Sequence, residues 1–359
     1  MKTVRFVSKD KQQLAATLRK KVNDYFKEKG ISTKGNTRMV LKSIVMITMF
    51  LAPFVVLLTV SLPAWTIFPL SVMIGIGMAG IGMSVMHDAA HGSFSRRSWL
   101  NKLFGGSMYM LGGNVFTWKV QHNVLHHTFT NISGMDEDID SKGIFRFSKE
   151  TPIRKAHRFQ HIYAFFFYSL MSLSKLFRDF FQLKIYHNAG HVRDQKSTLT
   201  KEYTTMVISK LVYLFVAIGL PIILTGFSWW LIVLGFVIVH LTAGLIMSIV
   251  FQLAHVVEGL EQPVPNAEGN IENDWVIHEL LTTSNFARKN RFITWLVGGL
   301  NFQIEHHLFP NICHVHYKHI SPIVEETVRE FGIPYHSQPT FRGAVLSHLR
   351  VLKALGRDK

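Results

Sequence analysis

The chain has 359 residues, of which 48% are hydrophobic and 17% are charged, and it carries a formal net charge of +16 at pH 7. That length suits one large domain or two small ones. A pI near 9.9 would fit a nucleic-acid-binding protein, but the long apolar segments described below argue against a nucleic acid as partner. Cys313 is the only cysteine, which excludes an intrachain disulfide and any cysteine-based zinc or iron–sulfur site.

Two segments contain no Asp, Glu, Lys or Arg. Residues 43–86 and 211–254 are each 44 residues long, and one membrane-spanning helix needs about 20 apolar residues. Each segment therefore predicts two spans joined by a turn, near Pro63 in the first and at 225–228 in the second. A core hairpin of a soluble protein is the alternative, but soluble helices show a polar stripe that these segments lack.

The spans are predicted at 42–62, 65–86, 206–224 and 229–254. Span two is rich in glycine, which permits close helix packing, at Gly75, Gly77, Gly80 and Gly82. Two shorter apolar stretches, 103–118 and 159–174, are expected to be helices in the membrane interface, unless one of them spans. The expected fold is all-α and integral to the membrane: four transmembrane helices in two hairpins, interfacial helices, and a cytoplasmic helical cap.

The charges predict the orientation. Residues 1–42 hold twelve Lys/Arg and three acids, and residues 87–205 hold sixteen Lys/Arg and nine acids. The positive-inside rule places both on the cytoplasmic side, and four spans return residues 255–359 to that side. We expect a multi-pass protein of a bacterial inner membrane or an equivalent membrane, with its active site facing the cytoplasm. The excess positive charge suggests contact with anionic lipid head groups or with an acidic protein.

One domain is therefore expected, in five consecutive segments. They are the basic arm 1–42, the first hairpin 43–86, the cytoplasmic or interfacial segment 87–205, the second hairpin 206–254 and the cytoplasmic segment 255–359.

Eight of the nineteen histidines form a pattern at the predicted cytoplasmic ends of the spans. They are His87, His91, His122, His126, His127, His255, His306 and His307. Residues four apart lie on one face of a helix, so each pair spaced in this way can converge on one metal. Adjacent residues point about 100° apart, so each doublet can reach two different metals. Eight imidazoles suit two ions, and imidazole suits zinc, copper, iron or nickel.

Other polar residues have weaker claims. Asp88 could orient a ligand imidazole, or it could be an ordinary helix-surface acid. Three residues could support the ligands or line a tunnel, or could simply pack: Asn301, Trp275 and Asn285. The acidic segment 136–140 is expected to be a capped loop rather than a metal site. His240 is expected to help helices pack, and His314, His316 and His319 are expected to be interfacial polar residues.

Three strings resemble the histidine boxes of membrane fatty-acid desaturases. They are His-Asp-Ala-Ala-His (87–91), His-Asn-Val-Leu-His-His (122–127) and Gln-Ile-Glu-His-His (303–307). The Gln at the head of the third box is typical of the front-end branch. Wider strings at 121–131, 253–258, 282–287 and 298–317 look closest to those of cyanobacterial-type acyl-lipid delta-6 desaturases. The resemblance covers nearly the whole chain, and its motifs are highly specific.

This resemblance implies an oxygen-dependent enzyme that holds two iron ions with the eight histidines. Gln303 would be a ligand or would lie beside the ligands, and no other catalytic residue is required. The product would carry a new cis double bond near the carboxyl end of an unsaturated acyl chain, at carbon 6, with carbon 5 still open. The substrate would be a fatty-acyl lipid or an acyl thioester. The sequence has no His-Pro-Gly-Gly haem motif, so a separate electron donor is expected, ferredoxin or cytochrome b5.

Three other functions compete with this interpretation. A fatty-acyl hydroxylase or other oxygenase could use the same scaffold, because the position of the substrate decides the outcome. An intramembrane zinc protease would need His-Glu-x-x-His within a span, and this string does not occur. A non-catalytic haem-binding electron carrier would need paired histidines on facing spans rather than doublets at their ends.

Overall fold

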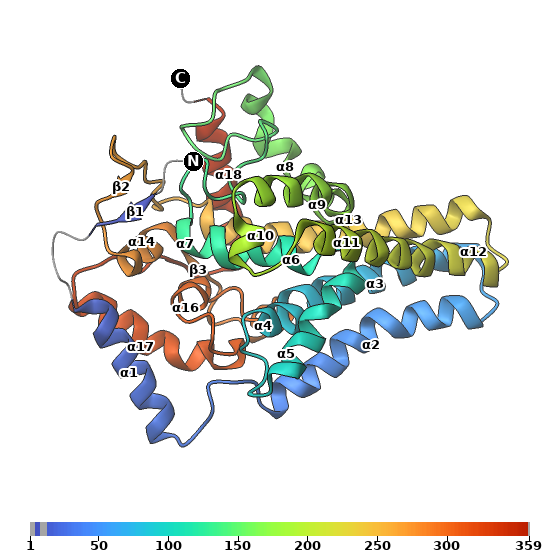
Figure 1. The fold of residues 1–359 in the computed structure, drawn as a ribbon, viewed down its shortest axis with the longest axis horizontal. Helices are drawn as coiled ribbons and strands as arrows, with labels where there is room; N and C mark the ends of the chain where they lie inside the picture. Colours follow the sequence, from blue (N-terminus) through green and yellow to red (C-terminus); the bar gives the residue numbers. More distant parts are fainter. Residues whose placement is uncertain (1–3, 8–12, 358–359) are drawn as a thin grey trace. The chain divides into compact units, whose positions relative to one another are not determined.

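The computed structural model describes residues 4–7 and 13–357, so part of the basic arm 1–42 and residues 358–359 lie outside the described residues. The chain forms two compact units, and Figure 1 shows the order of the elements along the chain by colour. Unit 1 comprises residues 1–36, 121–164 and 250–359, and unit 2 comprises residues 37–120 and 165–249. The prediction of five segments in a single domain stays a prediction.

Four helical runs are long and apolar enough to cross a membrane: Thr37–Thr59, Ala64–Ala90, Leu199–Leu224 and Trp229–His255. They confirm the four predicted spans and make the chain a multi-pass membrane protein, with ends a few residues from those expected. The runs consist of α2 (Thr37–Thr59); η1 (Ala64–Thr66), α3 (Ile67–Gly80), η2 (Ile81–Met86) and α4 (His87–Ala90); α11 (Leu199–Leu214), η6 (Phe215–Gly219) and α12 (Leu220–Leu224); and α13 (Trp229–His255).

The glycines of α3 allow close approach of neighbouring spans, as the sequence predicted. A Cβ atom added at Gly77 would lie 2.5 Å from the backbone nitrogen of Phe50 in α2, and one at Gly75 would lie 2.7 Å from Cβ of Thr242 in α13. Figure 1 shows α2 and α3 running side by side. Small residues let helix backbones approach and gain dispersion contacts where no hydrophobic driving force acts between helices.

The two shorter apolar stretches are not the single helices that we predicted. Residues 103–118 are divided among α5 (Ser98–Gly105), η3 (Gly106–Leu111) and α6 (Val115–Lys119). The break falls at Gly112, whose φ of 74° is a conformation that glycine adopts without steric cost. Residues 159–174 fall within η5 (Lys155–Phe159), α8 (Gln160–Ser169) and α9 (Met171–Asn188), and α10 (His191–Asp194) follows.

A buried ion pair joins α9 and α11 within unit 2. Lys210 Nζ lies 2.9 Å from Asp179 Oδ2, and the Thr117 hydroxyl of α6 donates to the other carboxylate oxygen of Asp179 at 3.0 Å. Lys210 also donates to the carbonyl oxygen of Gly112 at 3.0 Å. Buried charges are tolerated when they are paired and hydrogen-bonded, so this cluster fixes the position of α6 on the spans.

Unit 1 is built mostly from short helices. They are α1 (Leu14–Glu28), η4 (Val120–His126), α7 (His127–Phe129), η5, α14 (Trp275–Thr282), α15 (Arg291–Leu296), α16 (Gln303–Leu308), η7 (His314–His316), α17 (Tyr317–Glu330) and α18 (Phe341–Leu355). Two parallel strand pairs, which the sequence analysis did not foresee, join them: β1 (Arg5–Phe6) with β2 (Asn270–Ile271), and β3 (Asn285–Phe286) with β4 (Ser337–Gln338). The fold is mostly helical, as predicted.

The core of unit 1 begins with a helix that the sequence analysis treated only as part of a basic arm. Leu14, Leu18 and Val22 of α1 recur every four residues and are buried in one cluster with Tyr317 and Ile304. Such spacing places side chains on one helix face. α1 lies along α17 in Figure 1. Ile304 belongs to α16, so this core supports the helix that carries the third histidine box.

We expect Gly77→Ala to destabilise the detergent-solubilised protein by about 1–3 kcal/mol, because the added methyl group meets the α2 backbone and overpacked interiors must shift. Gly226→Ala is the matched control, since a Cβ atom there meets nothing within 4 Å. The measurement is the midpoint temperature of thermal aggregation, with the remaining soluble protein quantified by size-exclusion chromatography. Equal midpoints for the two variants would contradict close packing at Gly77.

Candidate metal centre

Six of the eight predicted ligands belong to unit 1, and all six are buried. η4 carries His122 and His126, and α7 begins at His127. His255 ends α13, and His306 and His307 lie on α16. Polar side chains are rarely so buried unless they are hydrogen-bonded or bind a ligand.

The second histidine box lies on a π-helix, not on the α-helix that the spacing argument assumed. In a π-helix the backbone repeat joins residues five apart. The ring centroids of His122 and His127 are accordingly 4.7 Å apart, whereas those of His122 and His126 are 5.4 Å apart. The Nε2 atoms of His122 and His127 face each other at 3.2 Å. The wider turn therefore brings both ends of this box together.

Two trios of imidazoles form within unit 1. In each trio, one ring nitrogen of every member lies within 4.8 Å of the others: His126, His255 and His307 in the first, and His127, His306 and His307 in the second. Each member is buried. His126 and His127 belong to different trios, whereas His307 belongs to both. Two sets of converging nitrogens suit two neighbouring metal ions.

The hydrogen bonding of His255 shows whether these residues fit a metal. Its Nδ1 lies 3.4 Å from the carbonyl oxygen of Thr282, which places the ring proton there. Its Nε2 is buried and has no hydrogen-bond partner among the described residues. A buried lone pair aimed at two other imidazoles is what a metal ligand requires, so the site fits a transition metal that prefers imidazole.

Two buried carboxylates hold ligand imidazoles. Asp136 accepts from His126 Nδ1 at 3.1 Å, and its oxygens also accept from the backbone N–H groups of Asn131 and Asp138 at 2.9 and 3.0 Å. Glu279 Oε2 lies 2.7 Å from His307 Nδ1. Such contacts fix the ring orientation and leave Nε2 for a metal.

The carboxylates also make the site electrostatically favourable for a positive charge. Burial alone would lower the pKa of His126, but Asp136 and Asp138 outweigh it and raise the pKa to about 9. The same field that favours an imidazolium favours a metal cation. Burial raises the pKa of Glu279 well above its ordinary value, and a cation at His307 would oppose that shift by favouring the carboxylate.

The turn after the second box connects the ligand-bearing segments. The Thr130 hydroxyl lies 2.7 Å from the His126 carbonyl oxygen and 3.0 Å from Glu279 Oε2. Asn131 has a φ of 60° and donates through Nδ2 to the carbonyl oxygens of His255 at 2.8 Å and Thr282 at 3.2 Å. Asparagine tolerates this left-handed conformation better than most residues. Box two, His255 and α14 are thus held by two side chains.

Sequence reasoning missed Asp136 and Glu279. The acidic segment 136–140 is a loop, as expected, but Asp136 is 1% exposed and acts on His126. Glu279 is the single acid in the otherwise largely apolar string Trp-Val-Ile-His-Glu-Leu-Leu. A single acid on an apolar helix is a usable signal, because burying it is costly unless a partner is present.

The other candidates lie near the box segments in varied roles. Trp275 Nε1 donates to the His127 carbonyl oxygen at 3.1 Å. Asn285 accepts from the Ile304 N–H at 2.9 Å and donates to Glu305 at 2.9 Å, which fixes the start of α16.

Asn301 donates to the Phe286 carbonyl oxygen at 3.1 Å, a packing contact. Gln303 is 1% exposed, and its Nε2 has no hydrogen-bond partner among the described residues.

His87 and His91 both belong to unit 2. Their ring centroids are 4.8 Å apart, and both rings meet Trp118 edge-on at 5.8 and 6.0 Å. Trp118 lies on α6, next to the Thr117 that binds Asp179. Between them, Asp88 is buried, and its carbonyl oxygen accepts from the Ser93 N–H at 2.8 Å. The Lys210–Asp179 cluster therefore helps place the residue that packs on both imidazoles.

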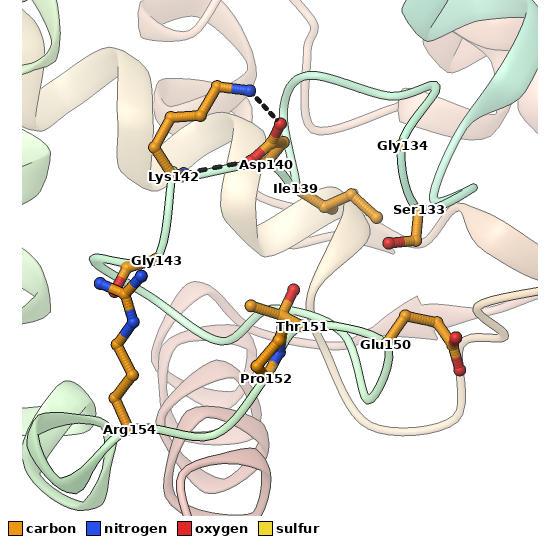
Figure 2. A pocket seen from close by; sticks show the side chains of 10 residues that line it. All are labelled: Ser133, Gly134, Ile139, Asp140, Lys142, Gly143, Glu150, Thr151, Pro152 and Arg154. Carbon is orange, nitrogen blue, oxygen red and sulfur yellow. Dashed lines mark hydrogen bonds and ion pairs between the residues drawn. The ribbon is translucent and has the colours of Figure 1, made fainter. Parts of the chain in front are cut away.

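The remaining histidines lie outside the two trios. His240 contacts the Ser172 hydroxyl at 2.9 Å and the Tyr213 hydroxyl at 2.8 Å, in keeping with a helix-packing role. His316 Nε2 donates to the Lys34 carbonyl oxygen at 3.0 Å, His314 is buried and His319 is exposed. A separate hollow of about 320 Å³ lies in the loop 133–154 (Figure 2), and no histidine lines it.

Comparison with known proteins identifies the class of this membrane protein. The family model described as fatty acid desaturase matches residues 63–339. The chain therefore belongs to the fatty acid desaturase family.

Individual relatives are similar over nearly the full length. The chain is 34% identical over 354 residues to the sn-1 linoleoyl-lipid 6-desaturase of Synechocystis sp., with 97% of this chain and 96% of that protein covered. It is 34% identical to the protein of the same name from Arthrospira platensis, with 94% and 91% covered. The acyl-lipid (8-3)-desaturase of Physcomitrium patens is 32% identical, with 99% of this chain and 74% of that protein covered.

We expect His307→Ala to lose most bound metal, because His307 belongs to both trios. His348→Asn is the control: His348 is equally buried, but its Nδ1 donates to the Val256 carbonyl oxygen at 2.7 Å, a bond that an asparagine amide can replace. Metal per chain is measured by inductively coupled plasma mass spectrometry on purified protein. Full metal content in His307→Ala would refute the shared position.

Proposed function

We propose that this desaturase introduces a cis double bond at carbon 6 of a linoleoyl chain carried on a membrane lipid. The similarity over nearly the whole chain to two proteins named linoleoyl-lipid 6-desaturases supports both the substrate and the position. The buried imidazole trios support the chemistry.

The proposed centre holds two iron ions through His87, His91, His122, His126, His127, His255, His306 and His307. Gln303 is proposed as a further ligand or as a hydrogen-bonding group beside the ions, since its buried amide nitrogen has no partner among the described residues. Two reduced irons with dioxygen would supply an oxidant strong enough to remove hydrogen from an unactivated methylene. We assign no acid or base catalysis to any side chain.

The task of the chain is to hold ligands and to position the substrate. Asp136 and Glu279 fix two imidazoles, and the burial of all six unit 1 histidines keeps bulk water from the centre. The acyl chain must lie with one carbon pair beside the ions, because position decides between desaturation and hydroxylation.

The proposed reaction requires an external electron donor. Removal of two hydrogens from the acyl chain supplies two of the four reducing equivalents that convert dioxygen to two waters. Two electrons and two protons must therefore come from elsewhere. We propose a separate donor, ferredoxin or cytochrome b5, at the cytoplasmic face, where the positive-inside rule places the basic segments and where positive charge would attract an acidic protein.

The test is to express the chain in cells that lack polyunsaturated acyl desaturases, to supply linoleate, and to analyse the lipids by mass spectrometry. We expect a new double bond at carbon 6 that is absent from His306→Ala, since His306 lies in the second trio. A bond at another carbon would correct the regiochemistry, and a hydroxylated product would move the protein to the sister activity. No product after both donors are supplied, with no iron in the purified protein, would refute the proposal.

A further inference from the structure

The four spans border a groove that none of the predicted ligands lines. Its volume is about 400 Å³, and all the residues that line it belong to unit 2. The lining is mostly apolar and includes Phe54 of α2, Ile74 of α3, Val212 of α11 and Phe236 of α13. An apolar cavity does not hold ordered water, so the groove suits an apolar occupant.

The groove opens on the outer surface of the spans. Leu51, Val212 and Val216 line it and are also exposed, Val212 by 56%. In a multi-pass membrane protein, the exposed apolar side of a span faces lipid tails. A lipid of the surrounding bilayer can therefore enter the groove from the side.

The length of the groove is close to the thickness of one leaflet. Along α11, η6 and α12, its lining runs from Ser209 to Pro221, which is about 18 Å at 1.5 Å per residue. Half of a hydrocarbon core of about 30 Å is about 15 Å. The π-helical turn η6 contributes Val216 and Ala217 to this wall, and such turns are frequent at functional sites. One acyl chain of a membrane lipid matches these dimensions.

One end of the groove lies at a membrane boundary. Ser209 is followed by Lys210 and then by the charge-free segment 211–254. Lys210 also donates to the Gly112 carbonyl oxygen at 3.0 Å, which holds the end of η3 at this level. η3 carries Tyr109, which lines the groove. Tyrosine is enriched at membrane–water interfaces, where its ring meets apolar groups and its hydroxyl meets polar ones.

The hydroxyl groups of the lining differ in their partners. Ser209 donates to the Met206 carbonyl oxygen at 3.0 Å, and the Tyr213 hydroxyl contacts His240 at 2.8 Å. The Tyr109 hydroxyl has no hydrogen-bond partner among the described residues. It is therefore available to donate to an oxygen atom of a lipid whose chain lies in the groove.

From this geometry we propose that the groove binds one acyl chain of a glycerolipid of the cytoplasmic leaflet, with the Tyr109 hydroxyl donating to an ester or phosphate oxygen of that lipid. The lipid is a resident part of the folded protein and not the substrate. A reacting carbon pair must lie beside the metals, whereas α3 lines the groove only from Ile67 to Ile74. The run from Ile74 to His87 is about 20 Å long.

The full-length protein in a mild detergent is incubated with dipalmitoyl phosphatidylglycerol, washed, and analysed by native mass spectrometry for lipid retained per chain. We expect one lipid per chain. Ala217→Phe should lose most of it, because the larger side chain fills the groove. Tyr109→Phe should weaken retention by about two- to tenfold, the net effect of one hydrogen bond. Ile223→Phe is the matched control and should retain the lipid, because Ile223 of α12 is 67% exposed and does not line the groove.

A second lipid separates a resident lipid from the substrate. Dilinoleoyl phosphatidylglycerol should be retained as well as the dipalmitoyl lipid, since an apolar wall holds both kinds of chain. A clear preference for the dilinoleoyl lipid would assign the groove to the substrate and overturn the proposal. Equal retention by Ala217→Phe and Ile223→Phe would overturn it too.

Two further measurements keep the test decisive. Size-exclusion chromatography of the same samples reports the oligomeric state, and a dimer that Ala217→Phe alone disrupts would place a second copy of the chain in the groove and refute the lipid. Circular dichroism verifies the fold of each variant. If Ala217→Phe does not fold, Leu51→Trp obstructs the groove from α2 and should lose the lipid in the same way.

Discussion

Much of unit 1 is arranged around one constraint, which is that buried imidazoles must present the correct nitrogen. A neutral imidazole has one donor and one acceptor nitrogen, and the partner of the first determines where the second points. Asp136 and Glu279 provide such partners for His126 and His307, and the Thr282 carbonyl oxygen does so for His255. The loop, the end of α13 and α14 are tied together by Thr130 and Asn131 for the same purpose. In this unit the contacts that fix the local backbone are thus also the contacts that orient the imidazoles.

The spans and the ligand candidates could be predicted from the sequence because each produces a strong local pattern. An uncharged segment of this length has few alternatives to a helical hairpin, and adjacent histidines are uncommon without a function. The glycines of α3 were predictable for the same reason, because their effect depends on size alone. In each case the signal lies within one short stretch and needs no knowledge of the partner segment.

The features that were missed depend on residues far apart in the chain. Glu279 acquires its role from His307 and Thr130, and no pattern around residue 279 specifies either partner. The burial of α1 was overlooked because charged residues on its outer face masked the regular apolar face. The break before α6 follows from the backbone conformation of Gly112, which an apolar composition does not reveal.

The π-helical turn at Val120–His126 constrains how the chain can change in length. Deleting a single residue between His122 and His126 would change the angle between His122 and the doublet by about 100°, one residue's share of a helical turn. Nε2 of His122 would then no longer face Nε2 of His127, which lies 3.2 Å away in the intact box. A deletion that a surface loop absorbs would here separate two imidazoles that the box holds together. The number of residues within the box therefore sets which imidazoles face each other. Insertions and deletions are tolerable only where no such spacing has to be kept.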